Sequence, residues 1–378
     1  MLRWIPLLLA LALLALGSLT AIKSPDWAPW KLSILAGEYG HWVALVPLLL
    51  AAIAWWSRGG HGTIALATTL VCALAEGFFL RPTVEAWLIA DALPAKLEKQ
   101  FGPAPFARAA FSPAHYFRSA PPSALVETLN YSGELALDLY RPPRANAGQV
   151  FPCVVLIHGG GWDSGSRAEI AHFNHWLASR GYAVAAIDYR LAPKFPWPAQ
   201  RDDALAAIAF LKAHAASLGI DPTRLVLLGR SAGGQIAEVV GYAAHDQAIR
   251  GVVALYAPSD MVFAYVNARE DDILKSPQLM RQYLGGTPDT ARENYLSASA
   301  LPLVGPHSPP TLILHGAIDS LVWFRHSVRL DAKLSAENVP HVFVALPWAT
   351  HAFEYNLAGP GGQLTTFALE WFLASVTR

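Results

Sequence analysis

One serine of the chain lies in a pattern that can hold a reactive hydroxyl. Gly229-Arg230-Ser231-Ala232-Gly233 is the single G-x-S-x-G of the sequence, and it stands between the apolar run 225–228 and a helical pattern. A sharp turn from strand to helix strains the serine backbone and exposes its hydroxyl, and flanking glycines remove steric conflict. We therefore predict that Ser231 is a nucleophile. The alternative is a glycine-rich turn with a capping serine.

A second glycine-rich segment, His158-Gly159-Gly160-Gly161-Trp162, follows the apolar run 153–157. Acyl transfer passes through a tetrahedral oxyanion, which needs backbone N–H donors that are in place before the reaction begins. A run of glycines lets the main chain approach a substrate closely. We predict an oxyanion hole formed by the N–H groups of Gly160, Gly161 and Ala232. An ordinary flexible turn is the alternative.

Three segments together resemble the hormone-sensitive-lipase-like esterases of the α/β-hydrolase superfamily. They are the residues 158–162, the run Asp188-Tyr189-Arg190-Leu191-Ala192-Pro193 and the residues 229–234. Two positions depart from that pattern, because Arg230 stands where the family usually has Asp and Lys194 where it usually has Glu. The segment 315–322, His-Gly-Ala-Ile-Asp-Ser-Leu-Val, is more similar to the feruloyl and acetylxylan esterase-like or prolyl-oligopeptidase-like branches. The resemblance covers roughly residues 125–378.

The resemblance implies that the partners of the serine follow in the order acid, then histidine. Asp319 stands after the run 311–314, at the place that the resemblance gives to the acid, and His351 follows the run 341–346. A neutral imidazole is the natural base for a serine hydroxyl, and a carboxylate fixes its tautomer. We predict a triad of Ser231, Asp319 and His351, with Asp260 as the alternative acid.

Other candidate residues carry weaker signals. His172 and His175 are three positions apart in a helical pattern, but no carboxylate pattern completes a metal site, so we interpret them as polar residues of a helix surface. The segment 261–301 is long enough to form a small cap over the site, or else a packed insertion. Neither a metal nor an organic cofactor is expected.

The elements that must position these residues alternate between short β-rich runs and helical patterns, which is typical of an α/β protein with a mostly parallel sheet. We predict an eight-stranded sheet flanked by helices, the α/β-hydrolase fold. A hairpin is expected from 126–130 and 134–140. The further strands are expected at 153–157, 183–187, 225–228, 252–256, 311–314 and 341–346, and the helices at 168–180, 199–218, 232–244, 323–336 and 363–375.

Composition limits the partners and points to lipid. Lys plus Arg and Asp plus Glu are both 28, so no basic surplus favours nucleic acid. Two cysteines cannot form a disulfide framework. Hydrophobic residues reach 53%, and charged residues only 15%, against about 25% on average.

The excess of apolar residues gathers near the N-terminus in three uncharged runs, 4–22, 39–57 and 59–75, with tryptophans near their edges. Nineteen residues of helix span roughly 28 Å, close to the hydrocarbon thickness of a bilayer. We predict a transmembrane region of about three helices over 1–81, an amphipathic, proline-rich connector over 82–122 that Pro94 interrupts, and a catalytic domain over 123–378. The first run could instead be a cleaved signal peptide, and the middle run a buried helix.

We thus predict a membrane-anchored serine esterase, with a small-molecule ester and the lipid bilayer as partners and the catalytic domain on the extracytoplasmic side. An amidase or peptidase on the same triad is one alternative. A membrane sensor or binding protein with an inactive hydrolase-like domain is another, which the intact set of Ser231, Asp319 and His351 disfavours.

Overall fold

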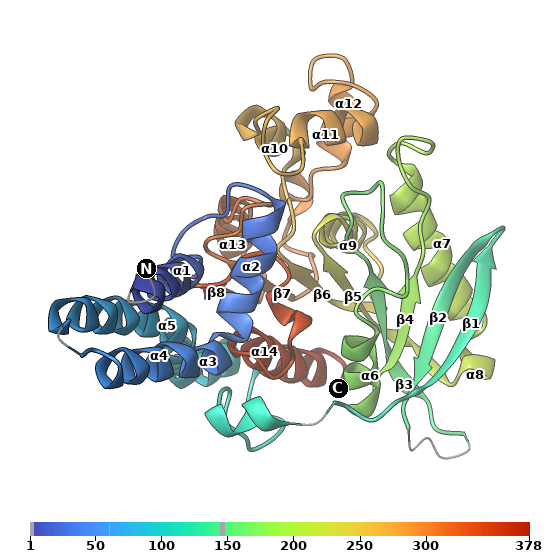
Figure 1. Ribbon diagram of the computed structural model, residues 1–378. Coiled ribbons are helices and arrows are strands. Elements are labelled where there is room, and N and C mark those ends of the chain that lie inside the picture. The colour runs from blue at the N-terminus through green and yellow to red at the C-terminus, as the bar shows by residue number, and fades with distance from the viewer. Residues whose placement is uncertain (1–3, 60, 119, 144–147) are drawn as a thin grey trace.

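Buried aliphatic runs form the strands of one central sheet. The computed structural model describes residues 4–59, 61–118, 120–143 and 148–378, and its sheet has the order β1-β2-β4-β3-β5-β6-β7-β8 (Figure 1). The bounds are β1 Leu125–Ser132, β2 Leu135–Arg141, β3 Phe151–Ile157, β4 Ala183–Ile187, β5 Ile220–Arg230, β6 Ile249–Leu255, β7 Thr311–Gly316 and β8 His341–Leu346. This architecture confirms the predicted fold class.

Parallel pairing brings the predicted site segments to one edge of the sheet. Strand β2 is antiparallel to β1 and β4, whereas β4, β3, β5, β6, β7 and β8 pair in parallel. Ile157 pairs with Gly229, Arg230 with Leu255, and Gly316 with Leu346, so these strands end at similar heights. Ligands bind beyond such carboxyl ends in open α/β sheets.

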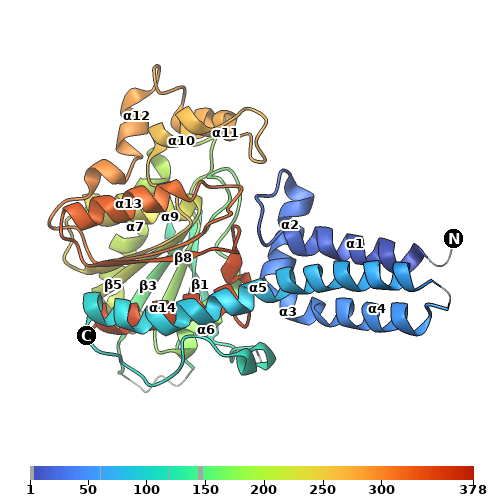
Figure 2. The same ribbon diagram turned by 90° about the vertical axis from the view of Figure 1, so that its left-hand side faces the viewer.

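Two layers of helices cover the sheet. One hydrophobic core joins it to α7 (Ala199–Ala213), α8 (Ala215–Leu218), α9 (Ala232–Ala243) and α13 (Arg325–Ala336). A second core, on the other face, joins it to α6 (Ala171–Ser179) and α14 (Pro360–Val376). Helix α14 is buried over most of its length because the C-terminal half of α5 (Gly62–Phe101) also packs in this layer (Figure 2). The predicted helices are confirmed, with ends shifted by a few residues.

Three short helices, in the segment that the sequence left open as a cap or a packed insertion, stand above the carboxyl edge of the sheet. They are α10 (Met261–Asn267), α11 (Ser276–Leu284) and α12 (Arg292–Ser297), drawn in orange in Figure 1. Tyr283 and Tyr295, both fully buried, belong to the same core as the sheet. The cap is therefore packed onto the domain that it covers.

The N-terminal segment forms helices that extend away from the sheet domain (Figure 2). They are α1 (Ile5–Ser18), α2 (Trp27–Glu38), α3 (Gly40–Val43), α4 (Leu45–Trp56) and α5 (Gly62–Phe101). Within the described residues, α5 is the one helix that is long and apolar enough by itself to cross a membrane. Helix α2 and the α3–α4 stretch form a pair bent by 79°, which would be a second span only if the pair is counted as one. Helix α1 is apolar but shorter. The described residues thus contain fewer helices of membrane-spanning length than the three that we predicted, because turns divide the apolar runs.

Helix α5 corrects one expectation about the connector. Pro94 does not interrupt the segment, because α5 continues through both Pro82 and Pro94. Leu93 and Leu97 are buried against the sheet domain, and this packing compensates for the main-chain hydrogen bonds that prolines remove. The predicted boundary between residues 81 and 82 thus falls inside one helix. Irregular chain follows from Gly102, with the short helix η2 at Pro113–Phe117.

A carboxylate joins α2 to the sheet domain. Glu38 is buried, and its Oε2 accepts a hydrogen bond from the N–H of Gly361 at 2.8 Å. Its Oε1 accepts one from Trp348 Nε1 at 3.3 Å, and its carbonyl oxygen one from Asn356 Nδ2 at 2.8 Å. Both the start of α14 and the loop after β8 are therefore tied to the N-terminal helices.

Candidate active site

The turn from β5 to α9 holds Ser231 in a strained conformation. Its φ is 52° and its ψ is −120°, and residues with a Cβ rarely adopt a positive φ. The Ser231 N–H donates to Leu255 O at 2.9 Å, which fixes the turn on the end of β6. Residues 225–230 and 232–242 are buried, and Ser231 between them is partly exposed. The strand–turn–helix context predicted for it is present.

Glycines at 229 and 233 are required by close packing. A Cβ on Gly229 would lie 2.0 Å from Gly233 O, and a Cβ on Gly233 would lie 2.2 Å from Ile157 O. Neither position can therefore carry a side chain unless the backbone moves. The first turn of α9 sits directly on the end of β3, from which the glycine loop begins.

The glycine loop approaches the serine and keeps two amides free. A Cβ built on Gly159 would lie 3.5 Å from Ser231 Cβ, so the glycine loop and the serine turn are in contact. The Gly159 N–H donates to Glu169 Oε2 at 3.0 Å. In the described part of the chain, the N–H groups of Gly160, Gly161 and Ala232 donate no hydrogen bond. These three amides are the donors predicted for the oxyanion.

Glycine is needed at 160 and 161 for conformational reasons. Their φ values are +95° and +58°, and a Cβ on Gly160 would lie 2.3 Å from Ser164 O. His158 supports the loop from below: its ring stacks on Tyr189 at 4.1 Å, and the Tyr189 hydroxyl donates to the carbonyls of His158 and Gly159.

Asp319 and His351 meet above the ends of β7 and β8. His351 Nδ1 lies 2.6 Å from Asp319 Oδ2, and Asp319 is fully buried. Burial would raise the pKa of Asp319, but the charge of His351 and hydrogen bonds from His315 and His351 outweigh it and hold that pKa below its ordinary value. The ionised carboxylate can only accept, so Nδ1 of His351 carries a proton and Nε2 is left as the base.

Sequence reasoning missed His315 as a second partner of the acid. Its Nε2 lies 3.2 Å from Asp319 Oδ2 and 3.1 Å from Val322 O. Because both are acceptors, this nitrogen must be protonated, and Nδ1 then accepts from Ser327 Oγ at 2.7 Å. The signal that was available is the spacing of four residues between His315 and Asp319.

A buried ion pair connects the serine turn with the histidine loop. Arg230 Nε donates to Glu354 Oε1 at 2.9 Å, and Tyr256 Oη donates to the same oxygen. The ring of Tyr256 lies 4.1 Å from that of His351. Tyr256 follows β6, next to Ser231, so the three predicted triad residues converge on one edge of the sheet. No hydrogen bond joins the Ser231 hydroxyl to His351 in the part of the chain that the structure describes.

The remaining candidates have other contacts. Asp260 caps α10 by accepting from Phe263 N–H at 2.9 Å and pairs with Arg329 at 2.6 Å. His172 Nε2 lies 2.7 Å from Tyr355 O, and His175 Nδ1 accepts from the N–H of Ala124 at 2.9 Å. Asp260 thus does not bind His351, and the two histidines bind main-chain atoms.

A small cavity of about 90 Å³ lies under the cap, lined by sequence neighbours of the predicted site residues. Trp162, which ends the glycine loop, and Ser320, which follows Asp319, both line it. Most of its other walls are apolar side chains of the cap and of the segment after β7: Phe263, Leu279, Met280, Leu321, Val322 and Trp323.

Comparison with known proteins identifies the family to which this chain is similar in sequence. The sequence model of the BD-FAE family matches residues 137–334, which is more than half of the 378-residue chain. "Probable carboxylic ester hydrolase LipM" of Mycobacterium tuberculosis is 29% identical over 255 residues, 64% of this chain and 58% of LipM. Carboxylesterase NlhH of the same species is 38% identical over 140 residues, 33% of this chain and 42% of NlhH. The match thus spans less than two thirds of either relative.

Two solved structures share the architecture. EstE1, a carboxylesterase cloned from a metagenomic library, aligns over 78% of this chain and 98% of its own with a TM-score of 0.58. A truncated carbohydrate esterase from gut microbiota aligns over 69% of this chain and 100% of its own, also with a TM-score of 0.58. Both are 22% identical to this chain, which establishes a common fold.

Proposed function

The chain belongs to the BD-FAE family, and from this membership we propose that it is a serine hydrolase that cleaves carboxylic esters. The observation that carries the proposal is the partly exposed Ser231 on a strained turn after β5, beside free amides. A bonded Asp319–His351 pair lies beyond the ends of β7 and β8 at the same edge of the sheet, with β6 between. Similarity to LipM and NlhH, whose names state carboxylic ester hydrolysis, supports the choice of ester over amide.

The proposed reaction has two halves. His351 Nε2 takes the Ser231 proton while the hydroxyl oxygen bonds to the ester carbonyl carbon. The amides of Gly160, Gly161 and Ala232 stabilise the oxyanion, and the carbon–oxygen bond to the alcohol breaks as His351 returns the proton to it. Water, deprotonated by His351, then attacks the acyl-enzyme and releases the acid and free Ser231. Asp319 keeps the imidazole in one tautomer and stabilises its charged form.

The cavity under the cap supports a preference for short acyl chains. Its volume of about 90 Å³ is far below the roughly 300–1,000 Å³ that encloses drug-sized ligands. A long acyl chain would have to displace the side chains of the cap or leave the cavity.

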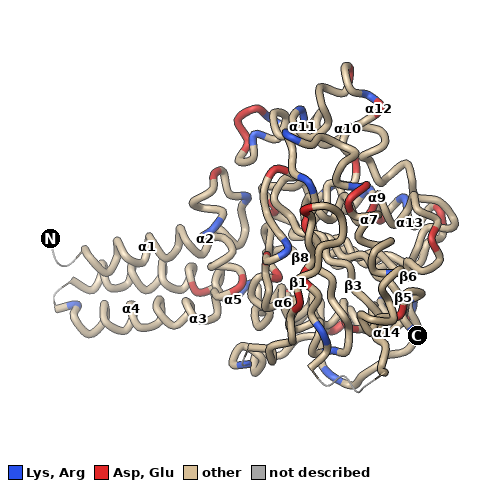
Figure 3. The backbone as a smooth tube through the Cα atoms, turned by 90° about the vertical axis from the view of Figure 1, so that its right-hand side faces the viewer, with Lys and Arg blue, Asp and Glu red and all other residues tan. Residues whose placement is uncertain are grey.

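We also propose that the N-terminal helices anchor the enzyme in a bilayer. Leucines of α1, α4 and α5, among them Leu8, Leu49 and Leu74, are more than half exposed. Figure 3 shows hardly any charge along the outer part of this bundle. Figure 2 shows α1 starting at the end far from the sheet domain, so insertion of the bundle leaves the N-terminus and the catalytic domain on opposite sides. With the N-terminus inside, the catalytic domain is extracytoplasmic.

The test uses the full chain in detergent micelles, an alkyl fluorophosphonate probe and nitrophenyl esters of two to twelve carbons. Wild type should be labelled and should hydrolyse the short esters, and Ser231→Ala should lose labelling and at least about 10⁴-fold in kcat. Ser217→Ala, at an exposed serine of α8, is the matched control and should be labelled like wild type. Absence of labelling in wild type would favour a binding protein, and faster turnover of matched amides than esters would favour an amidase.

A further inference from the structure

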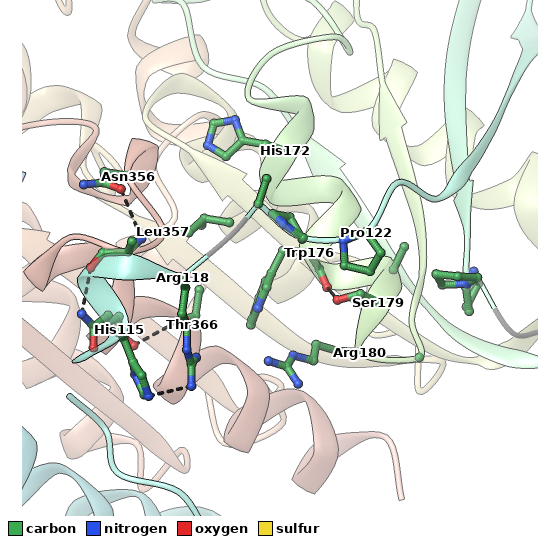
Figure 4. A pocket seen from close by; sticks show the side chains of 18 of the residues that line it. His115, Arg118, Pro122, His172, Trp176, Ser179, Arg180, Asn356, Leu357 and Thr366 are labelled. Atoms are coloured by element: carbon green, nitrogen blue, oxygen red, sulfur yellow. Dashed lines mark hydrogen bonds between the residues drawn. The ribbon is translucent and has the colours of Figure 1, made fainter. Parts of the chain in front are cut away.

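A second cavity, of about 1000 Å³, lies apart from the predicted active site (Figure 4). It is enclosed by the connector before β1, the end of α6, the start of α14 and the loop that follows η4 (Phe353–Tyr355). None of the residues predicted to carry catalysis lines it. Its size and chemistry therefore call for an explanation of their own.

Three arginines, Arg108, Arg118 and Arg180, converge on this cavity from different segments. Figure 4 shows Arg118 and Arg180 extending toward the same open space. No acidic side chain lines it among the described residues. Behind the wall, Glu370 bonds Arg108 at 2.7 Å and lies 3.7 Å from Arg180, so one carboxylate contacts two of the three guanidinium groups. The cavity has an excess of positive charge.

These arginines keep unused hydrogen-bonding capacity. Arg108 Nε is buried without a partner in the described part of the chain. Arg118 Nη2 lies 2.6 Å from His115 Nε2, and because guanidinium only donates, His115 must accept and be neutral there. Burial, followed by the charge of Arg118, lowers the pKa of His115, in agreement with that role. Guanidinium groups with free donors form strong paired hydrogen bonds with phosphate oxygens.

The walls indicate that the ligand is more than an inorganic ion. Apolar side chains of Pro121, Pro122, Pro142, Trp176 and Leu357 contribute to the walls. A cavity of about 1000 Å³ is at the upper end of what encloses organic ligands, and a lone phosphate would fill a small part of it. An anion attached to an apolar group fits both the charge and the walls.

The cavity opens near the end of the bundle at which lipid headgroups would lie. Tyr39, at the junction of α2 and α3, lines it together with Tyr355. The preceding wall, η2, stacks Tyr116 on His41 of α3 at 3.5 Å and leaves the ring of Phe117 74% exposed next to Trp42. Exposed aromatic rings at this level are typical of a membrane–water interface.

We propose that this cavity binds the phosphate group of an amphiphile, held by Arg108, Arg118 and Arg180, with its apolar part against the proline and tryptophan walls. An anionic phospholipid is the membrane source of such a group, and a soluble glycerol phosphate is the other. The membrane source rests on the proposed anchoring, whereas recognition of the phosphate does not.

The experiment is a calorimetric titration of the full chain in a neutral detergent. The probes are dihexanoylphosphatidylglycerol, sn-glycerol 3-phosphate and, without phosphate, dihexanoylglycerol. The double variant Arg118→Gln/Arg180→Gln should bind the phosphate probes about tenfold more weakly or worse, since each loses charge-assisted hydrogen bonds. Arg201→Gln/Arg269→Gln removes two arginines that lie outside this cavity and pair with Asp202 and Asp271, and should bind like wild type.

Tighter binding of the lipid probe than of glycerol phosphate supports a lipid ligand, and the reverse supports a soluble one. Three results overturn the proposal: no phosphate probe binds more tightly than about 1 mM, dihexanoylglycerol binds as tightly as the phosphate lipid, or the double variant binds like wild type. Every chain in these titrations also carries Ser231→Ala, so that the active site does not hydrolyse the ester probes, and loss of catalysis is distinguishable from loss of this site. An unchanged Tm of the double variant shows that it is folded.

Discussion

Asp319 shows how a single buried carboxylate is kept ionised. Its Oδ1 accepts from the N–H groups of Leu321 and Val322 at 2.8 and 3.0 Å, and its Oδ2 faces His351 and His315. Burial raises the pKa of Asp319, but the charge of His351 and the hydrogen bonds from His315 and His351 outweigh burial and lower that pKa. The carboxylate therefore stays charged well into the acidic range, so loss of activity on acidification should not arise from Asp319.

Substitution of the two candidate acids tests this assignment. Asp319→Asn should lower kcat by about 10⁴-fold. The amide NH₂ group of Asn can donate to Nδ1 of His351, which favours the tautomer that carries its proton on Nε2 and so removes the base. Asp260→Asn, which removes the partner of Arg329, should change kcat less than about tenfold, since it acts only through the cap. Steady-state kinetics on a short nitrophenyl ester measures both. The opposite order would make Asp260 the acid.

Glu238, on α9, is a second buried carboxyl with a different environment. Its Oε1 accepts from Ser259 Oγ at 3.0 Å, and its Oε2 has no partner in the described part of the chain. Burial raises its pKa to about 8, and the hydrogen bond from Ser259 offsets only part of that rise. The folded protein thus holds a proton at neutral pH that the unfolded chain releases.

The sign of this shift predicts how stability depends on pH. The contribution of the protonated Glu238 is full below its ordinary pKa and is lost as pH rises through about 8. Between pH 5 and 8.5 the Tm of wild type should fall more steeply than that of Glu238→Gln, which keeps the amide neutral. The exposed Glu293→Gln should follow wild type. Thermal unfolding in micelles at a series of pH values measures this, and parallel curves for all three would contradict it.

At the scale of elements, the Arg230–Glu354 pair fixes the loop after β8 to the turn after β5. Both side chains are buried, and Arg230 also lies over the ring of Phe173 at 4.5 Å. Arg230 is one of the two departures from the family pattern that the sequence displays. In this chain the charge at that position serves to anchor the segment that carries His351.

Breaking the Arg230–Glu354 ion pair should lower the free energy of unfolding. Glu354→Gln leaves the Arg230 charge buried without a counter-charge, and we expect a loss of about 3–5 kcal/mol in the free energy of unfolding. Asp221→Asn, at the surface pair with Arg224, should cost less than about 1 kcal/mol. The double substitution Arg230→Met/Glu354→Leu should recover much of the loss. Denaturant unfolding measures all three, and equal effects at the buried and surface pairs would refute the role of the buried one.

At the scale of the whole molecule, the N-terminal bundle is packed in the way of membrane helices. Small residues lie at its helix contacts: a Cβ on Gly17 would lie 3.0 Å from Phe78 Cβ, and Ala10, Ala65 and Ala75 are buried. Large apolar side chains face outward instead. Helix α5 then continues along the sheet domain, and Glu38 ties α2 to the start of α14. Bundle and catalytic domain are thereby held in one orientation.

The outward leucines predict how the protein distributes in a cell. Leu49→Arg places a charge on the exposed face of α4 and should reduce the fraction that resists alkaline carbonate extraction, because a mid-membrane Arg costs about 2.5–3.5 kcal/mol. Val266→Arg, at a site on the cap that is 71% exposed, should leave that fraction unchanged. Immunoblots of extracted membranes measure it. Full release of the wild-type chain by carbonate would contradict the anchoring.

The sequence by itself determined the local features of this protein. The G-x-S-x-G turn, the glycine loop and the β-rich runs are encoded within a few neighbouring residues, so periodicity and turn chemistry suffice to predict them. Strands β4 and β8 have the predicted bounds. Family resemblance, rather than spacing, pointed to Asp319.

Only the tertiary structure decided the contacts between distant segments. Glu354 and Arg230 are 124 positions apart, and Glu38 and Gly361 are 323 apart, so no local pattern reveals either pair. Pro94 stays within α5 because its buried neighbours Leu93 and Leu97 pack against the sheet domain. Intrinsic helix propensity does not include such tertiary contacts. The arginine-lined cavity, likewise, is assembled from segments that are separate in the sequence. Such features depend on which surfaces meet when the sheet and its helix layers assemble, and that is a property of the whole fold.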